Sequence, residues 1–288
     1  MASMWFWICG WLLVFVTVIG NGLVIFLVAT RSCLHTSANR FILSLAVADL
    51  CCGLSFFPPM FGAEFGFYTI DLTHAGVFFK VSFTFFYCSN ASVCAMAVDR
   101  LLAITKPLRY VSLMTTETIR ILIFAAWMAP LLLFGIPSIF MYRDNPGFTM
   151  FVEISRVIIF QISPVVMFVI ATCHLLRLAL KSNRKTNVLL SQVRFNHASG
   201  EIIIKGPPPR KHARASTVLI VLIMTFFNVT YLGGNYRCIC LLTDVCPFTG
   251  TLSYIIHLVL IANSAVNPIF YSFFKKDIRR ELRCMFSS

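Results

Sequence analysis

Seven long apolar segments dominate this chain of 288 residues. A helix needs about 20 apolar residues to cross the hydrocarbon core of a bilayer. The segments show no strand-like alternation, and only helices or closed barrels satisfy every backbone polar group in lipid. The pattern predicts an all-α integral membrane protein, a seven-transmembrane helix bundle with spans at Trp5–Ala29, Phe41–Ala63, Leu72–Ile104, Ile119–Met141, Phe148–Leu180, Ala215–Leu232 and Leu252–Phe274.

The charge distribution predicts how the chain is oriented. The net charge of +13 would suggest nucleic-acid binding in a soluble protein, but the basic residues gather in alternate connections between spans, so we expect no nucleic-acid partner. Of the 24 Lys and Arg residues, those toward the opposite side are Lys80, Arg143, Arg156 and Arg237. The positive-inside rule then predicts a multi-pass plasma-membrane protein with an extracellular N-terminus and a cytoplasmic C-terminus. The basic loops would face anionic membrane lipid and cytosolic partners, although membrane anchoring alone explains them about equally well.

The domain organisation is expected to be simple. We predict one membrane domain at 1–274, whose first span is a retained helix because it lacks the basic start of a signal peptide. A short cytoplasmic segment at 275–288 follows, in which Phe274, Ile278 and Leu282 recur every four residues with cations between them. This spacing predicts an amphipathic helix on the inner leaflet. Cys284 near its end is a candidate for palmitoylation, and an unmodified thiol is the alternative.

A cysteine cluster marks the outer connection between the sixth and seventh spans. Cys238, Cys240 and Cys246 lie there, on the side where an oxidising environment permits a disulfide. A Cys240–Cys246 bridge would close a short loop, but the spacing does not determine the pairing.

Polar residues inside the spans are candidate functional sites because they are costly in lipid. Asp49 lies in the middle of the second span, Asn21 in the first, Ser89 in the third and Asn263 in the seventh. Hydrogen bonding between helices is the simpler explanation for such groups. It is less satisfactory for Asp49, because a buried carboxylate needs a cation, a proton or several donors.

A set of short motifs occurs in order along the spans, each in a particular span. Together they resemble the rhodopsin-like family of G-protein-coupled receptors, and the resemblance covers essentially the whole chain. The motifs are Gly20-Asn21, Leu45-Ala46-Val47-Ala48-Asp49, Asp99-Arg100-Leu101, Pro107-Leu108-Arg109-Tyr110, Trp127, Pro164, Asn263-Ser264 and Asn267-Pro268-Ile269-Phe270-Tyr271.

The resemblance implies roles in coupling to a heterotrimeric G protein. Arg100 would engage the G-protein α subunit when the cytoplasmic side opens, and Asp99 would hold Arg100 when that side is closed. The Pro107-Leu108 motif would place Leu108 in a hydrophobic pocket on the G protein. Tyr271 would swing inward on activation, in the Asn267-Pro268 region where the proline weakens the helix.

The resemblance also implies an internal sodium site. Its oxygen ligands, which suit a hard cation, would come from Asp49, Ser89, Asn263 and Asn267. No other cofactor and no enzymatic reaction are expected.

An extracellular ligand would bind between the outer halves of spans three, five, six and seven. Ser82 stands where amine receptors carry an aspartate, which disfavours a monoamine, and the sequence does not choose between a small molecule, a lipid and a peptide. An aromatic stripe at helical spacing is more often core packing than a pocket wall. The candidate pocket residues are Phe79, Ser82, Phe83, Phe86, Arg156, Tyr231 and His257.

Several positions depart from the family pattern. Ala75 replaces the usual third-span cysteine, and the sixth span lacks the Cys-Trp-x-Pro stretch, where Tyr231 is a substitute for the tryptophan and Gly233-Gly234 for the kink. Asn90 replaces an apolar residue of the core relay. Cations around Lys211 replace an acidic partner of Arg100, from which we expect raised basal activity.

Two other functions compete with a coupling receptor. A receptor-like membrane protein without G-protein coupling is compatible with the altered sixth span. A transporter or channel would need paired ionisable residues along a pathway and internal repeats, whereas Asp49 is the one deeply placed charge and no repeat is visible.

Overall fold

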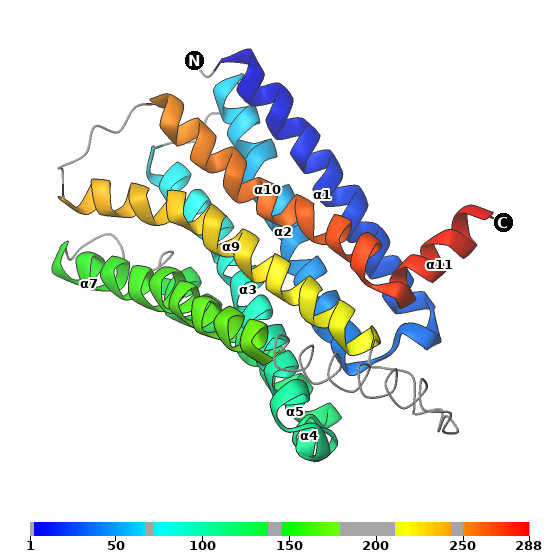
Figure 1. Ribbon diagram of the computed structural model, residues 1–288. Coiled ribbons are helices and arrows are strands. Elements are labelled where there is room, and N and C mark those ends of the chain that lie inside the picture. The colour runs from blue at the N-terminus through cyan, green and yellow to red at the C-terminus, as the bar shows by residue number, and fades with distance from the viewer. Residues whose placement is uncertain (1–2, 67–71, 138–145, 179–210, 244–249, 288) are drawn as a thin grey trace, which may run out of the picture.

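The computed structural model describes residues 3–66, 72–137, 146–178, 211–243 and 250–287, with side chains except at 72–81, 107, 146, 149, 211–217, 237–239, 241–243, 250 and 286. All regular structure in these residues is helical (Figure 1). Six helices among them are long and apolar enough to cross a membrane. The helix of 34 residues that carries the third predicted span completes a bundle of seven.

The helices occupy the predicted spans. Two of them contain a π-helical turn: the fourth span joins α5 to η2, and the fifth joins α7, η3 and a helical stretch that ends at Leu178. The bounds are α1 (Met4–Thr30), α2 (Ser37–Glu64), α3 (Leu72–Thr105), α5 (Thr116–Pro130), η2 (Leu131–Gly135), α7 (Pro146–Val157), η3 (Ile158–Ile162), α9 (Lys211–Thr243) and α10 (Gly250–Phe274).

The sixth span is longer than predicted. The apolar run indicated an end at Leu232, but α9 continues through Gly233 and Gly234 to Thr243. A glycine costs a helix only about 1 kcal/mol relative to alanine, so a packed helix tolerates the pair. A β-carbon at Gly233 would lie 3.5 Å from Cγ1 of Ile256 on α10, so this segment of α9 runs close to its neighbour.

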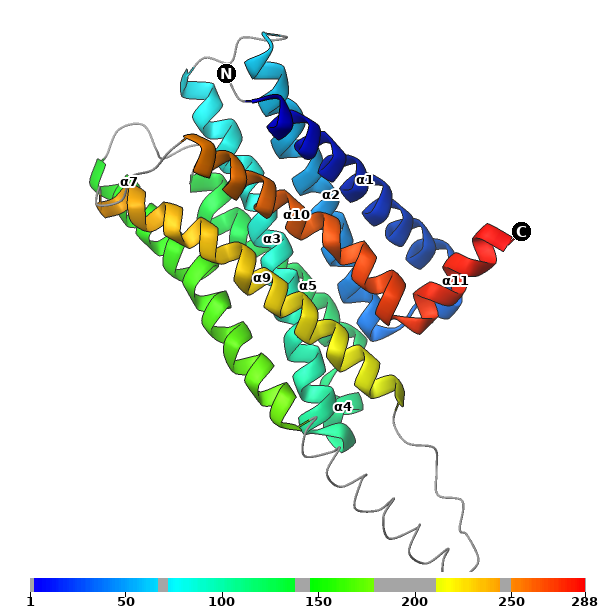
Figure 2. The ribbon, with the colours of Figure 1, turned by 45° about the horizontal axis from the view of Figure 1, so that its top comes forward.

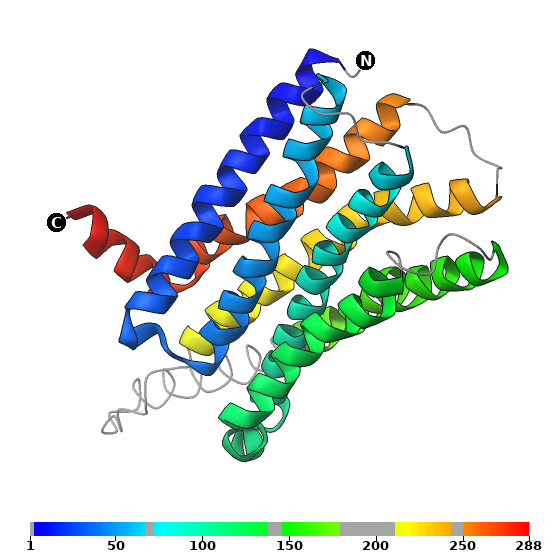
Figure 3. The same ribbon diagram turned by 180° about the vertical axis from the view of Figure 1, so that it is seen from behind.

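The bundle places α2 between α1 and α3, and α10 against α1, α2 and α9. Figures 1 and 3 show these helices running side by side along the length of the bundle. The Asn21 amide donates to the Ser264 carbonyl oxygen at 3.0 Å, which joins α1 to α10. Gly20 allows the close approach, because a β-carbon there would lie 2.9 Å from the ring of Pro268. The Gly20-Asn21 motif therefore holds the first helix against the seventh.

Trp127 takes part in a hydrogen-bonded link between three helices. Its indole Nε1 on α5 donates to the Ser44 hydroxyl on α2 at 3.0 Å. The Ser44 hydroxyl lies 3.2 Å from the Ser92 hydroxyl on α3. Each of the three side chains in this hydrogen-bonded link has a partner within it, which suits a site surrounded by lipid and apolar side chains.

Three short helices lie at the inner end: η1 (Ser32–Leu34), α4 (Pro107–Leu113) and the predicted amphipathic helix, α11 (Lys276–Ser287). In Figure 2, α11 turns away from the direction of α10. Ile278 is fully buried, and Leu282 packs on the same core. Part of this apolar face therefore packs against the bundle itself, and the position of the helix on the inner leaflet stays a prediction.

A polar clasp anchors the start of α11 to α2. The Lys275 ammonium donates a hydrogen bond to Oδ1 of Asn39, and its nitrogen lies 3.6 Å from Oδ2 of Asp277. The Asn39 amide in turn donates to Asp277 at 3.1 Å. Burial lowers the pKa of Lys275, and the Asp277 carboxylate opposes that shift. The residue is 9% exposed, so this clasp is largely shielded from water.

Candidate functional site

The C-terminal end of α3, which the charge pattern predicts to face the cytoplasm, carries a closed polar contact. Arg100 donates to Oδ2 of Asp99 through Nε at 2.7 Å and through Nη2 at 2.5 Å. The Tyr110 hydroxyl from α4 donates to Oδ1 of the same carboxylate at 2.7 Å. Burial raises the pKa of Tyr110 to about 12, and the bond to Asp99 acts in the same direction, so the phenol is protonated and able to donate at neutral pH. Tyr110 stood in a quoted motif but had been assigned no role.

Next to this contact, α4 carries exposed apolar side chains. Pro107 occupies the start of the helix, where its missing N–H removes no helical hydrogen bond. The side chains of Leu108 and Val111 follow at a spacing of three residues and are 97% and 79% exposed. An exposed leucine of this extent on a water-facing helix is a marker of an interaction surface.

The second group of predicted residues surrounds Asp49 in the middle of the bundle. Its carboxylate is fully buried and accepts three hydrogen bonds. The Ser89 hydroxyl donates at 2.7 Å, the Ser264 hydroxyl at 2.9 Å and the Asn267 amide at 2.7 Å. These donors come from α3 and α10, so the carboxylate connects three helices. Ser264 was named in the motif but not among the predicted ligands.

Asn263 is the fourth residue predicted for this cluster. Its buried Oδ1 has no hydrogen-bond partner among the described residues. The buried Oδ1 atom of Asn21 also has no hydrogen-bond partner among the described residues. A carboxylate, hydroxyl oxygens and unpaired amide oxygens in one buried region fit the ligand preference of a hard monovalent cation.

Tyr271 closes the inner side of the same region. Its side chain is fully buried, and its hydroxyl has no hydrogen-bond partner among the described residues. Pro268 lies one turn before it in α10 and packs on Gly20. Burying a hydroxyl without a hydrogen-bond partner costs free energy. A different position of the Tyr271 side chain, in which its hydroxyl forms a hydrogen bond, would recover that cost.

The predicted pocket residues divide into two groups in the outer half. The first group surrounds the fully buried Phe56 of α2, which the sequence analysis had not singled out. Its ring centroid lies 5.4 Å from that of Phe83, 5.7 Å from Phe86 and 5.4 Å from His257. The rings fill the space between α2, α3 and α10 and form an aromatic wall.

Ser82 belongs to this group for a structural reason. Pro59 in α2 has no N–H, so the carbonyl of Ser55 four residues earlier loses its helical donor. The Ser82 hydroxyl supplies a donor to that carbonyl at 2.7 Å. The side chain at the position where amine receptors carry an aspartate is therefore engaged with the backbone of α2.

The second group lies between α3 and the fifth span. Arg156 donates to Glu153 at 2.6 Å and to the Tyr87 hydroxyl at 2.5 Å, and its guanidinium carbon lies 5.5 Å from the centre of the Phe134 ring. Gln161 donates to the same Tyr87 oxygen at 3.4 Å. Of the predicted pocket residues, Arg156 therefore contacts Glu153 and Tyr87, whereas His257 contacts Phe56 in the first group.

Asn90 connects this second group to the π-helical turn η3. Its amide donates to the Phe160 carbonyl oxygen at 3.0 Å. A π turn departs from the regular i→i−4 ladder and leaves carbonyl groups available to other donors. Asn90 thus donates a hydrogen bond to the Phe160 carbonyl, which an apolar side chain at this position could not do.

Tyr231 of α9 occupies the place of the missing tryptophan. Its ring is buried and stacks on Phe227 at 5.9 Å between centroids, with an angle of 18° between planes. The hydroxyl donates to the Phe86 carbonyl oxygen at 3.4 Å, which joins the sixth helix to the third. Phe79 and Ala75 lie in α3, but their side chains are outside the described set.

The remaining predicted sites are partly described. Cys240 is buried and disulfide-bonded, while its predicted partner, Cys246, lies outside the described residues. Cys284 is an exposed free thiol on α11. The side chain of Lys211, on which the expectation of basal activity rested, also lies outside the described set.

The arrangement of seven membrane helices, an inner Asp-Arg pair and a buried aspartate agrees with a family-level match. Residues 20–271 match the family model for the seven-transmembrane receptor (rhodopsin family). The chain belongs to this rhodopsin-like receptor family. It is a multi-pass membrane receptor that signals through G proteins, and not an enzyme.

Individual relatives show how divergent the chain is. The octopamine receptor beta-2R of Chilo suppressalis is 25% identical, over 96% of this chain and 79% of that receptor. Galanin receptor 2a of Danio rerio is 28% identical, over 93% of this chain and 74% of that receptor. Adenosine receptor A2b of Gallus gallus is 40% identical over a shorter region, 39% of this chain and 33% of that receptor.

Proposed function

We propose that an extracellular ligand binds in the outer half of the bundle and favours a state in which Arg100 and Leu108 contact a heterotrimeric G protein. The observation that carries this proposal is that the Asp99 carboxylate accepts hydrogen bonds from both Arg100 and Tyr110. Its two oxygens bind Arg100 and Tyr110, directly beside the exposed Leu108. Ligand binding acts as a population shift, because a ligand moves such an equilibrium only by its difference in affinity for the two states.

The orientation follows from the same proposal. The Asp99–Arg100 pair and α4 face the cytoplasm, which places the N-terminus outside the cell and the C-terminus inside at the plasma membrane. The receptor domain comprises 1–274, and 275–288 form the cytoplasmic helix, where Cys284 is the exposed acceptor for a palmitoyl chain.

The aromatic wall is the proposed ligand contact surface. Phe83, Phe86 and His257 gather there around Phe56, whereas Ser82 is engaged with a backbone carbonyl and Arg156 with Glu153. The relatives are named for octopamine, galanin and adenosine, which differ widely in chemistry. We therefore assign a contact surface that is aromatic and mostly apolar, and leave the chemical class of the ligand open.

We propose the Asp49 cluster as the sodium site. Asp49, Ser89 and the unpaired oxygen of Asn263 would supply oxygen ligands, with Asn267 beside them. A bound sodium ion would supply the positive charge that balances the carboxylate. The protein's own contribution is to hold that carboxylate between three helices, so that its charge state influences how they pack.

Constitutive G-protein activation tests the proposed coupling. Wild type, Arg100→Ala and Leu108→Ala would be compared at matched surface levels, with Arg120→Ala as control because Arg120 is an exposed arginine whose side chain is 74% accessible. We expect signal in wild type and the control, none from Arg100→Ala, and a reduced signal from Leu108→Ala. Equal signal from wild type and Arg100→Ala would overturn the assigned role of Arg100. No signal from any variant with any G protein would favour a receptor-like protein that does not couple.

A further inference from the structure

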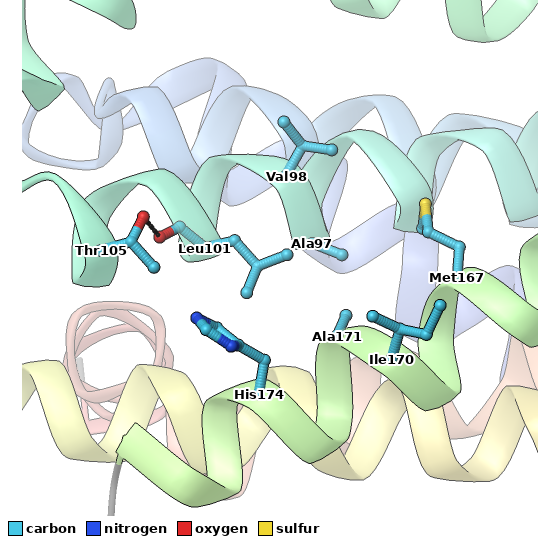
Figure 4. A pocket seen from close by; sticks show the side chains of 8 residues that line it. All are labelled: Ala97, Val98, Leu101, Thr105, Met167, Ile170, Ala171 and His174. Atoms are coloured by element: carbon cyan, nitrogen blue, oxygen red, sulfur yellow. Dashed lines mark hydrogen bonds between the residues drawn. The ribbon is translucent and has the colours of Figure 1, made fainter.

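A cavity of about 310 Å³ opens between α3 and the fifth span, away from the outer aromatic wall and from the Asp49 cluster. Figure 4 shows the two helices contributing facing stripes of side chains. On α3 the stripe is Ala97, Leu101 and Thr105, and on the fifth span it includes Ala171 and His174. These positions recur every three or four residues, which places each stripe on one helical face.

Two small side chains create the space. Ala97 and Ala171 are buried at the middle of the cavity and lie opposite each other in Figure 4. A larger side chain at either position would fill the gap that their methyl groups leave. The space is a groove open to the outer surface of the bundle, so a molecule of the surrounding membrane can enter it.

The cavity faces the hydrocarbon of the membrane. Two of its lining side chains, Val98 and Ile170, are 36% and 64% exposed on the outer surface of the bundle. The lining is apolar except at the end formed by Thr105 and His174. The Thr105 hydroxyl is occupied by the Leu101 carbonyl at 2.6 Å, so it adds no free donor. A hydrocarbon chain matches this surface, whereas a polar solute would lose its hydration without replacement.

The polar end of the cavity is basic. His174 is exposed there, Arg177 follows it by one helical turn, and Lys106 follows Thr105 at the end of α3. None of these three side chains has an acidic partner among the described residues. The two cations, Lys106 and Arg177, lie at the cytoplasmic end of both helices, where the inner leaflet presents its anionic headgroups, and His174 adds a hydrogen-bonding group beside them. Apolar walls along the groove and cations at its polar end are the two features that a binding site for an anionic phospholipid needs.

We propose that this groove binds one acyl chain of an inner-leaflet anionic phospholipid, with the phosphate at His174 and Arg177. The charge of the mouth distinguishes this occupant from a sterol, whose neutral hydroxyl would make no use of the cations. The site is separate from the proposed extracellular ligand site, and its occupancy is measurable without any G protein.

Photolabelling in nanodiscs tests the steric half of the proposal. The full chain would be reconstituted with a phosphatidylserine that carries a photoreactive acyl chain, and labelled residues would be mapped by mass spectrometry. We expect labels on α3 and the fifth span around Ala97 and Ala171. Ala171→Phe should lower labelling there at least ~5-fold, whereas Ala125→Phe, which adds the same bulk to an exposed position on α5, should not. Unchanged labelling in Ala171→Phe would overturn the proposal.

The charged half has its own test, which does not depend on the folding of Ala171→Phe. Competition between anionic and zwitterionic photoreactive phospholipids would be compared in wild type, Arg177→Gln and the control Arg120→Gln. One cation near an anionic surface contributes about 1 kcal/mol, so Arg177→Gln should reduce the preference for the anionic lipid roughly 5-fold. Equal labelling by both lipids in wild type, or displacement of the label by a sterol, would reject an anionic phospholipid as the occupant.

Discussion

Two buried polar clusters cross this bundle, and they are built in opposite ways. Around Asp49, one carboxylate is surrounded by donors from Ser89, Ser264 and Asn267. The other cluster, between α3 and the fifth span, is arranged around donors, the Arg156 guanidinium and the Asn90 amide. There Asn90 and Gln161 each bury an oxygen with no hydrogen-bond partner among the described residues.

The difference shows what each cluster stabilises. The inner cluster holds a charged group, and every donor is placed to compensate it. The outer cluster holds backbone and a cation, because Asn90 binds the Phe160 carbonyl in a π turn and Arg156 lies against Tyr87 and Glu153. Unpaired amide oxygens occur in both clusters, on Asn90 and Gln161 in the outer one and on Asn21 and Asn263 in the inner one, so the clusters differ in the group that they surround.

The largest effect is expected from removal of the Asp49 carboxylate. Asp49→Ala leaves three buried donors without an acceptor, at about 1 kcal/mol or more each, so unfolding free energy should fall by about 3 kcal/mol. Thermal and denaturant unfolding in detergent would measure the loss. Ser89→Ala, which removes a single donor, should cost about 1 kcal/mol. If both variants were equally stable, the donors would not depend on the carboxylate as the geometry indicates.

The outer cluster should reject a charge that the inner one accepts. Asn90→Asp replaces the amide donor by an oxygen that faces the Phe160 carbonyl and carries no compensating donor, with an expected cost of about 2 kcal/mol. Asn90→Leu also leaves the Phe160 carbonyl without its donor but buries no charge, so it should cost less, about 1 kcal/mol. The same unfolding assay ranks them, and a tolerated aspartate would mean that the two clusters are alike.

The arginine of the outer cluster offers a finer test. Arg156→Lys keeps the charge but not the planar fork that reaches Glu153 and Tyr87 at once, so we expect a loss of about 1 kcal/mol. A double-mutant cycle with Glu153→Gln would isolate the pair. A coupling energy near zero would indicate that the ion pair, which is partly open to solvent, contributes little and that the Tyr87 contact dominates.

The smallest effect concerns Asn263. Its side-chain oxygen bonds to nothing among the described residues, so Asn263→Ala should alter stability without sodium by no more than about 0.5 kcal/mol. With sodium, wild type should melt at a higher temperature than without it, and this shift should shrink in Asn263→Ala. Ser264→Ala serves as the contrast, because it should lose stability in both buffers. A full sodium shift in Asn263→Ala would remove Asn263 from the proposed ligand set.

Much of the inner cluster could be predicted because it consists of motif residues whose place along each span is known from sequence. Asp49, Ser89 and Asn267 were expected together and lie together. The outer cluster was not foreseen as a unit. Arg156 and His257 were expected to face one ligand, but hydropathy reports only the depth of a residue along a span and not the direction in which its side chain points.

The misjudged end of α9 has a related cause. Residues after Leu232 are less apolar and include two glycines, so the pattern indicates a boundary there. The helix continues because packing against Ile256 and Leu260 of α10 outweighs the weak local preference.

The amino-acid sequence alone determined the class of fold, because no other arrangement buries seven such segments in lipid with their backbone bonds satisfied. It also determined the orientation proposed here, since charge placement is a property of the chain. Only the tertiary structure decided that Ser82 serves the carbonyl opposite Pro59, that Asn90 serves a π turn, and that two alanines leave a groove in the inner half. Each of these depends on which helical faces meet, and that is decided by packing between segments far apart in the chain.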